Sequence, residues 1–192
     1  MKNKLLAIAA LAAACGLPAH ALTLQGTSTT PGNTLVDYSA PGLLSFDADF
    51  GDRGFVSAEY QIEADDLLAP LDFSALVHNL TGIGIDGIGI GLSAGSFSGI
   101  GTVTRFFGGA AQVLGAGTDA VEIRFDTPEF LDVEIGDVFS TPGASNWTID
   151  LRGLNVGDRF TITMAVPEPG SLALLAAALS LGLVATMRRR RG

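Results

Sequence analysis

The sequence predicts an all-β protein in which one β-sandwich occupies residues 22–165, between two hydrophobic terminal segments. Several stretches of this middle segment alternate apolar and polar residues with a period of two, as strands with one buried and one wet face do. Turn-forming pairs, among them Pro41-Gly42, Pro142-Gly143 and Gly157-Asp158, separate these stretches. The segment contains no convincing helical period. Short strands without intervening helices favour two packed sheets.

The clearest strands are four segments whose alternation is complete, namely residues 56–62, 120–126, 146–151 and 159–166. Weaker candidates are residues 43–49, 71–79, 99–107 and 131–135, and residues 64–71 can form one helical turn. Trp147 alternates in phase with Ile149 and Leu151, so we expect its side chain in the core. Roughly seven to ten short strands suit a jelly-roll or Ig-like sandwich, and the sequence leaves that choice open.

The glycine-rich stretch 82–91 has isoleucines at positions 83, 85, 88 and 90, and their phase changes around Asp86-Gly87. An Asp-Gly pair is typical of a two-residue hairpin turn. We therefore expect two short strands joined by a hairpin here, and a flexible rim loop is the alternative.

The middle segment is strongly acidic. Both lysines, Lys2 and Lys4, and four of the arginines lie in the terminal segments, whereas every acidic residue except Glu168 lies in the middle segment. An acidic surface repels nucleic acid and anionic lipid, so we expect neither as a partner of this segment. It suits solubility outside the cell and a loose attraction for divalent cations.

Two motif matches point to chemistry that the rest of the sequence does not support. Gly82, Gly84 and Gly87 have the spacing of a dinucleotide fingerprint, but more glycine follows where a helix is needed. Ser93 lies in a Gly-x-Ser-x-Gly pattern, yet no helix can follow it, and His78, the only histidine of the middle segment, precedes the serine. We expect no catalytic residues and no enzymatic activity.

The best cation candidates are Asp47, Asp49 and Asp52, which could supply three carboxylate ligands for calcium near a turn. Their spacing does not follow an EF-hand loop, and a solvated acidic strand end is the simpler interpretation. No other cofactor is indicated.

Residues 1–21 resemble a secretory signal peptide. Two lysines precede an apolar run, and Ala19-His20-Ala21 forms a small-residue site, so we expect cleavage after Ala21. A lipobox ending at Cys15 is the alternative, although Ala12 stands where a larger aliphatic residue is usual. Cleavage after Ala21 removes the only cysteine and leaves no thiol chemistry in the mature chain.

Residues 166–192 have three parts in a fixed order: Val166-Pro167-Glu168-Pro169, an uncharged apolar run over residues 172–187, and Arg188, Arg189, Arg190 and Arg191. As a helix the apolar run would span roughly 25 Å, close to the thickness of a bilayer core. The prolines stop the helix from extending backwards, and the arginines favour the cytoplasmic face. We therefore expect one transmembrane helix with its C-terminus inside.

This tail resembles the PEP-CTERM sorting signal of Gram-negative bacteria, because all three parts are present at the C-terminus. The resemblance implies recognition by a membrane-embedded exosortase, cleavage near Pro167–Pro169, and sorting to the cell surface or the exopolysaccharide matrix. It covers only the tail and implies little about the sandwich. The expectation is thus an exported, non-catalytic surface or matrix protein; the alternatives are a calcium- or glycan-binding adhesion module and a plain single-span membrane protein.

Overall fold

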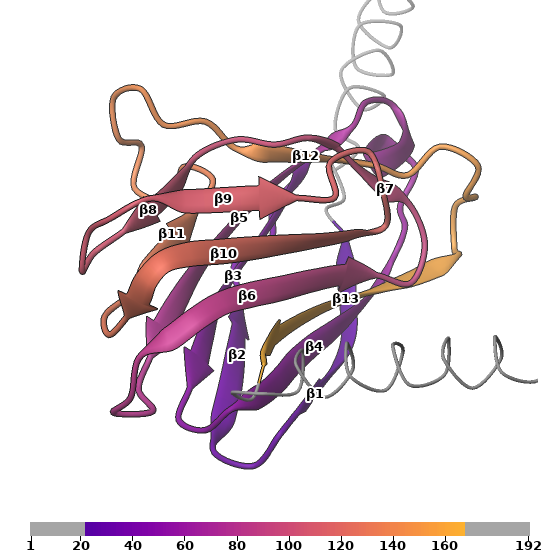
Figure 1. The fold of residues 1–192 in the computed structure, drawn as a ribbon. Coiled ribbons are helices and arrows are strands. Elements are labelled where there is room, and N and C mark those ends of the chain that lie inside the picture. Colours follow the sequence, from indigo (N-terminus) through magenta and orange to yellow (C-terminus); the bar gives the residue numbers. More distant parts are fainter. Residues whose placement is uncertain (1–21, 168–192) are drawn as a thin grey trace, which may run out of the picture.

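Two β-sheets packed face to face make up the protein in the computed structural model, which describes residues 22–167 (Figure 1). The all-β class and the sandwich of two packed sheets are confirmed. Within residues 22–167, no helix is long and apolar enough to cross a membrane. The expected signal peptide (1–21) and the expected transmembrane helix (172–187) lie outside the described residues.

The first sheet has six strands in the order β1-β4-β13-β6-β10-β9, and all its neighbours are antiparallel. Its strands are β1 (Thr23–Thr29), β4 (Gly54–Gln61), β13 (Arg159–Val166), β6 (Ile85–Leu92), β10 (Ala120–Glu129) and β9 (Ala111–Leu114).

The second sheet has seven strands, of which five follow the order β2-β3-β5-β11-β8. They are β2 (Asn33–Asp37), β3 (Leu43–Phe50), β5 (Leu71–Asn79), β11 (Val133–Ile135) and β8 (Val103–Arg105). Two more, β12 (Trp147–Asp150) and β7 (Ser96–Gly99), extend from β5. β3 and β5 are parallel, so the chain must cross over between them. It does so through β4 in the other sheet and the 3₁₀ turn η1 (Asp65–Leu67).

The core lies between the sheets and is built from the apolar positions of the alternating segments. Trp147 is fully buried, as expected, and its ring meets those of Phe73 and Phe97 edge to face. Tyr60 stacks on Phe160. The buried apolar residues run from Leu22 to Val166, so the segment 22–167 carries its own core.

The clearly alternating segments all became strands, and β13 has the predicted bounds. Of the weaker candidates, 71–79 is β5, and residues 99–107 contain the last residue of β7 and the short strand β8, so most of β7 was not indicated. The sequence did not indicate β1, β2 and β9. Each lies at or near a sheet edge, where backbone pairing rather than a buried face holds the strand.

The expected hairpin at Asp86-Gly87 is wrong, because residues 85–92 form the single strand β6. A side chain at Gly87 would place its Cβ 2.3 Å from the carbonyl oxygen of Ile123 on β10. The pairing slips here: Gly87 lies opposite Arg124, but Ile85 lies opposite Glu129. The pairing of β6 with β10 is irregular at this point, and Ile85 and Ile88, three positions apart, are both buried in one strand.

We predict that Gly87→Ala destabilises the sandwich by about 1–3 kcal/mol, because the strands would have to separate to admit the methyl group. Gly91→Ala in the same strand is the matched control. A Cβ at Gly91 meets nothing within 4 Å, so this change should be neutral or raise stability by up to about 1 kcal/mol. Urea unfolding of the segment 22–167 measures both, and equal effects of the two substitutions would contradict the close approach.

Candidate functional site at the end of the sandwich where β13 stops

The sequence places its strongest functional signal directly after the sandwich, so the end at which β13 stops is the candidate site. β3 and β5 stop at this end with Phe50 opposite Asn79, and β10 stops there with Glu129 opposite Ile85. The side-chain amide of Asn79 donates to the carbonyls of Ile83 (2.8 Å) and Glu129 (2.9 Å), which ties the two sheets together. We call this the exit end (Figure 1).

Val166 and Pro167 are the parts of the expected sorting signal that the structure describes. Val166 is the last residue of β13, lies opposite Gly54 and is 2% exposed in the core. Pro167 is half-buried at the surface. Glu168, Pro169 and Arg188 to Arg191 lie outside the described residues, as do Ala19 and Ala21. The sandwich therefore extends one residue into the expected signal.

Arg53 holds the chain where it leaves β13. Its Nη1 donates to the carbonyl oxygen of Pro167 (3.2 Å) and its Nη2 to that of Gly84 (3.1 Å). Arg53 lies in the turn between β3 and β4. The side chain of Asp52 accepts from the backbone N–H of Arg53 at 2.7 Å and stabilises that turn. One guanidinium group thus joins the exit point to the turn between β5 and β6.

A buried ion pair stabilises the neighbouring loops. Nε of Arg105 lies 3.2 Å from Oε2 of Glu129, and both side chains are almost fully buried. The other carboxylate oxygen of Glu129 accepts from the backbone N–H groups of Phe107 (3.0 Å) and Leu131 (2.9 Å). Glu129 therefore fixes the loops that follow β8 and β10, and its charge is compensated in place.

The calcium candidates are not brought together. Asp47 and Asp49 share the outer face of β3, where Asp49 accepts from the Thr34 hydroxyl at 2.9 Å. Burial raises the pKa of Asp47; the nearby His78 opposes that shift, and Asp49 adds to it. The side chain of Asp52 instead accepts a hydrogen bond from the backbone N–H of Arg53 in the turn after β3. Among residues 22–167, no three His, Cys, Asp or Glu side chains form a group that could hold a metal ion.

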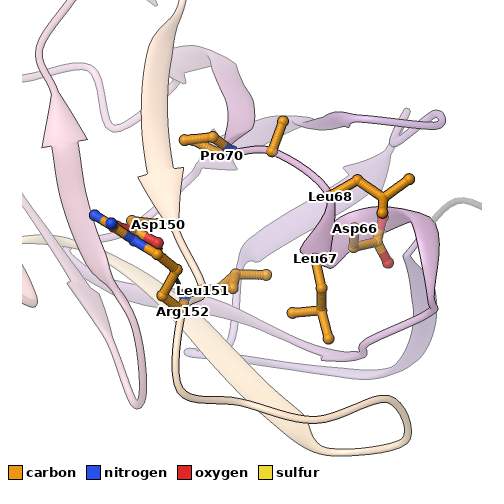
Figure 2. A pocket seen from close by; sticks show the side chains of 8 residues that line it. Asp66, Leu67, Leu68, Pro70, Asp150, Leu151 and Arg152 are labelled. Atoms are coloured by element: carbon orange, nitrogen blue, oxygen red, sulfur yellow. Dashed lines mark hydrogen bonds and ion pairs between the residues drawn. The ribbon is translucent and has the colours of Figure 1, made fainter.

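A cavity of about 260 Å³ lies at the opposite end, between η1 and the end of β12 (Figure 2). Arg152 pairs with Asp150 on one wall. On the other, Asp66 is 1% exposed; its Oδ2 accepts from the backbone N–H of Glu63, and its Oδ1 has no partner. Burial raises the pKa of Asp66. Leu67, Leu68, Leu151 and Pro70 make up most of the remaining lining, so the cavity is largely apolar.

The structure does not bring together the serine and histidine of the hydrolase-like motif. Ser93 follows β6, and its Oγ accepts from the backbone N–H of Thr161 at 2.8 Å. His78 lies near the exit end, with its Nδ1 3.2 Å from Asp132. Serine and histidine are therefore at opposite ends of the sandwich. The glycine-rich stretch is a strand and lacks the strand–turn–helix geometry of a dinucleotide site.

Sequence reasoning missed the role of Arg53. Its contact with Pro167 joins residues 114 positions apart, and nothing in the local pattern indicates it. The buried Arg105–Glu129 pair was missed for the same reason.

The protein is a two-sheet β-sandwich. The chain leaves it after β13, at Pro167, whose carbonyl oxygen accepts a hydrogen bond from Arg53. The chain matches no protein-family model, no curated protein and no solved structure.

We predict that Arg53→Ala loosens the exit point. Two carbonyls would lose a charged donor, which should cost about 1–2 kcal/mol and speed hydrogen exchange in a peptide covering the end of β13. Arg159→Ala is the control, because Arg159 makes only an exposed pair with Glu59 and its loss should cost under about 0.5 kcal/mol. Unchanged exchange at residues 160–167 in Arg53→Ala would show that the contact does not hold the strand end.

We predict that Asp66→Asn stabilises the domain at neutral pH by on the order of 1 kcal/mol. The folded state binds the Asp66 proton more tightly than the unfolded chain does, so this residue costs stability as pH rises above the unfolded pKa of about 3.9. The amide keeps an acceptor for Glu63 and carries no charge. The gain should vanish near about pH 3, and exposed Asp119→Asn should show no such dependence. A pH-independent difference between wild type and Asp66→Asn would contradict this account.

Proposed function

We propose that this protein is an exported, non-catalytic component of the cell surface or the exopolysaccharide matrix. In this proposal the signal peptide is removed after Ala21, and the apolar run 172–187 then anchors a jelly-roll or Ig-like sandwich in the inner membrane. Arg188 to Arg191 keep the C-terminus in the cytoplasm. An exosortase-like enzyme recognises Val166–Pro169, cuts near Pro167–Pro169 and releases the domain.

The observation that carries the proposal is that the residues next to both expected processing sites are buried in the core. Leu22, the first residue after the expected signal-peptide site, is 5% exposed, and Val166, the last residue before Pro167, is 2% exposed. A chain cut after Ala21 and again after Pro167 would keep every core residue that the structure describes. Cuts at these two positions are therefore compatible with the core of residues 22–166, whereas a cut inside that range would remove buried residues.

The surface charge agrees with an extracellular role. Five arginines remain in the sandwich against many acidic residues, and three of them, Arg124, Arg152 and Arg159, pair with surface carboxylates. The electrostatic potential at the surface is therefore negative, which favours solubility and disfavours the binding of nucleic acid. Export, matrix association and the processing enzyme rest on the resemblance of the tail.

The test is the intact mass of the protein in the inner-membrane, surface and medium fractions of its native host. We predict a species that begins at Leu22, ends near Pro167–Pro169 and lies outside the inner membrane. Replacing Pro167, Glu168 and Pro169 by alanine should leave the tail uncut and the protein in the inner membrane. Pro142→Ala, in an exposed loop, is the control and should be processed normally.

A wild-type protein that keeps Arg188 to Arg191 and remains in the inner membrane would contradict the proposal. The tail would then be an ordinary anchor, and the protein a plain single-span membrane protein. Normal processing of the triple-alanine variant would instead show that the Pro-Glu-Pro element is not the signal.

A further inference from the structure

Six large apolar side chains are exposed in three loops of the exit end. They lie between β5 and β6, between β8 and β9, and between β10 and β11, and each is between 48% and 62% exposed. We call them the apolar cluster: Leu80, Ile83, Phe106, Phe107, Phe130 and Leu131. Gathered apolar residues of this size on a soluble domain mark a contact surface.

The apolar cluster is held in shape by the fold. The rings of Phe107 and Phe130 pack with their centroids 5.2 Å apart. Phe130 also lies over Gly84, where an added Cβ would come within 2.8 Å of the ring. Glu129 binds the backbone of both aromatic loops and is itself paired with Arg105. The surface is therefore formed before any partner arrives.

The chain leaves the sandwich beside this cluster. Arg53 bridges the carbonyl of Pro167 and the carbonyl of Gly84, and Gly84 carries the ring of Phe130. Five residue steps lead from Pro167 to Leu172, where the apolar run begins. A fully extended chain covers at most about 17 Å in five steps. A tail inserted in a bilayer would therefore hold the exit end close to the lipid surface.

We propose that the apolar cluster is a membrane-docking surface, which enters the lipid interface while the C-terminal tail spans the bilayer. The inference rests on the proposed anchor. The contact is mainly apolar, because three acids in or next to the cluster's loops are paired: Asp126 and Glu129 with Arg105, and Asp132 with His78. Asp86, three residues after Ile83, is exposed and adds negative charge at this end. The overall negative charge of the domain still disfavours anionic lipid, so zwitterionic lipid is the matching partner.

The tether makes a weak contact effective. A few aromatic and aliphatic side chains give only reversible binding to a bilayer, but a short tether makes that binding intramolecular and raises the local concentration of lipid. Docking would thus exist only while the tail is attached. Cleavage near Pro167–Pro169 would release the domain without a separate undocking step.

The test uses the full chain in phosphatidylcholine vesicles with either ordinary or bromine-labelled acyl chains, which quench nearby tryptophan. Phe107→Trp places a probe in the cluster. Val156→Trp is the matched control, because Val156 is 57% exposed and lies before β13 begins, at the opposite end. Trp147 is fully buried, and the unsubstituted chain supplies its signal for subtraction.

We expect bromine-labelled lipid to reduce the added fluorescence of Phe107→Trp roughly twofold, since interfacial side chains reach the acyl boundary, and to leave Val156→Trp unchanged. In the unsubstituted chain, vesicles should slow hydrogen exchange in the two aromatic loops, which gives a readout independent of the tryptophan variants. The segment 22–167 without its tail should show neither effect.

Vesicle flotation distinguishes failure of the docking proposal from failure of the proposed membrane anchor. A chain that floats with vesicles but shows no quenching at position 107 and no slowed exchange overturns the docking proposal and leaves the anchor standing. A chain that does not float overturns both. A blue-shifted but unquenched probe in a chain that cross-links as a dimer would assign the cluster to a second copy of the protein and overturn lipid docking.

Discussion

Strand β13 is the last strand within residues 22–167, yet it lies inside the six-stranded sheet, hydrogen-bonded to β4 on one side and β6 on the other. Its alternate side chains, Phe160, Ile162, Met164 and Val166, point into the core. The first sheet is therefore incomplete until the chain has been made through Val166, and loss of this strand would divide the sheet in two. A C-terminal processing event compatible with a folded domain has to fall after Val166, which is where the Pro-Glu-Pro element begins.

The sandwich has five arginines, and two of them, Arg53 and Arg105, lie at the exit end. Arg124, Arg152 and Arg159 form exposed pairs, which contribute little to stability. Arg105 and Arg53 make buried or partly buried contacts to backbone and carboxylate groups, and both lie where loops from the two sheets converge. A charged group bound by several partners in a partly dry environment fixes geometry more strongly than a surface pair does. These two arginines therefore determine the shape of the end from which the tail departs.

The same end combines three features of different physical origin. Strand pairing sets the position at which the chain leaves, Arg53 fixes its direction relative to the turn between β5 and β6, and the Arg105–Glu129 pair presents two aromatic loops beside it. The opposite end carries the cavity lined by Asp66 and by the Arg152–Asp150 pair (Figure 2). The end where the chain leaves β13 is thus also the end with the exposed apolar cluster and the two arginines that bind several partners. A domain that only kept the protein soluble would not need this combination.

Local patterns in the sequence determined the all-β class, the bounds of β13 and β5, and the burial of Trp147, because a period of two in apolar residues requires no knowledge of distant partners. These patterns failed where contacts with distant parts of the chain decide the local structure. The polar strand β1 forms because it can pair with β4, and Gly87 lies in a strand because residues 85–91 pair with β10. Arg53 and Pro167 are 114 positions apart, and only the tertiary structure brings them into contact. The sequence predicts where the tail begins, and the fold decides which surface accompanies it, since that surface is assembled from loops that are remote along the chain.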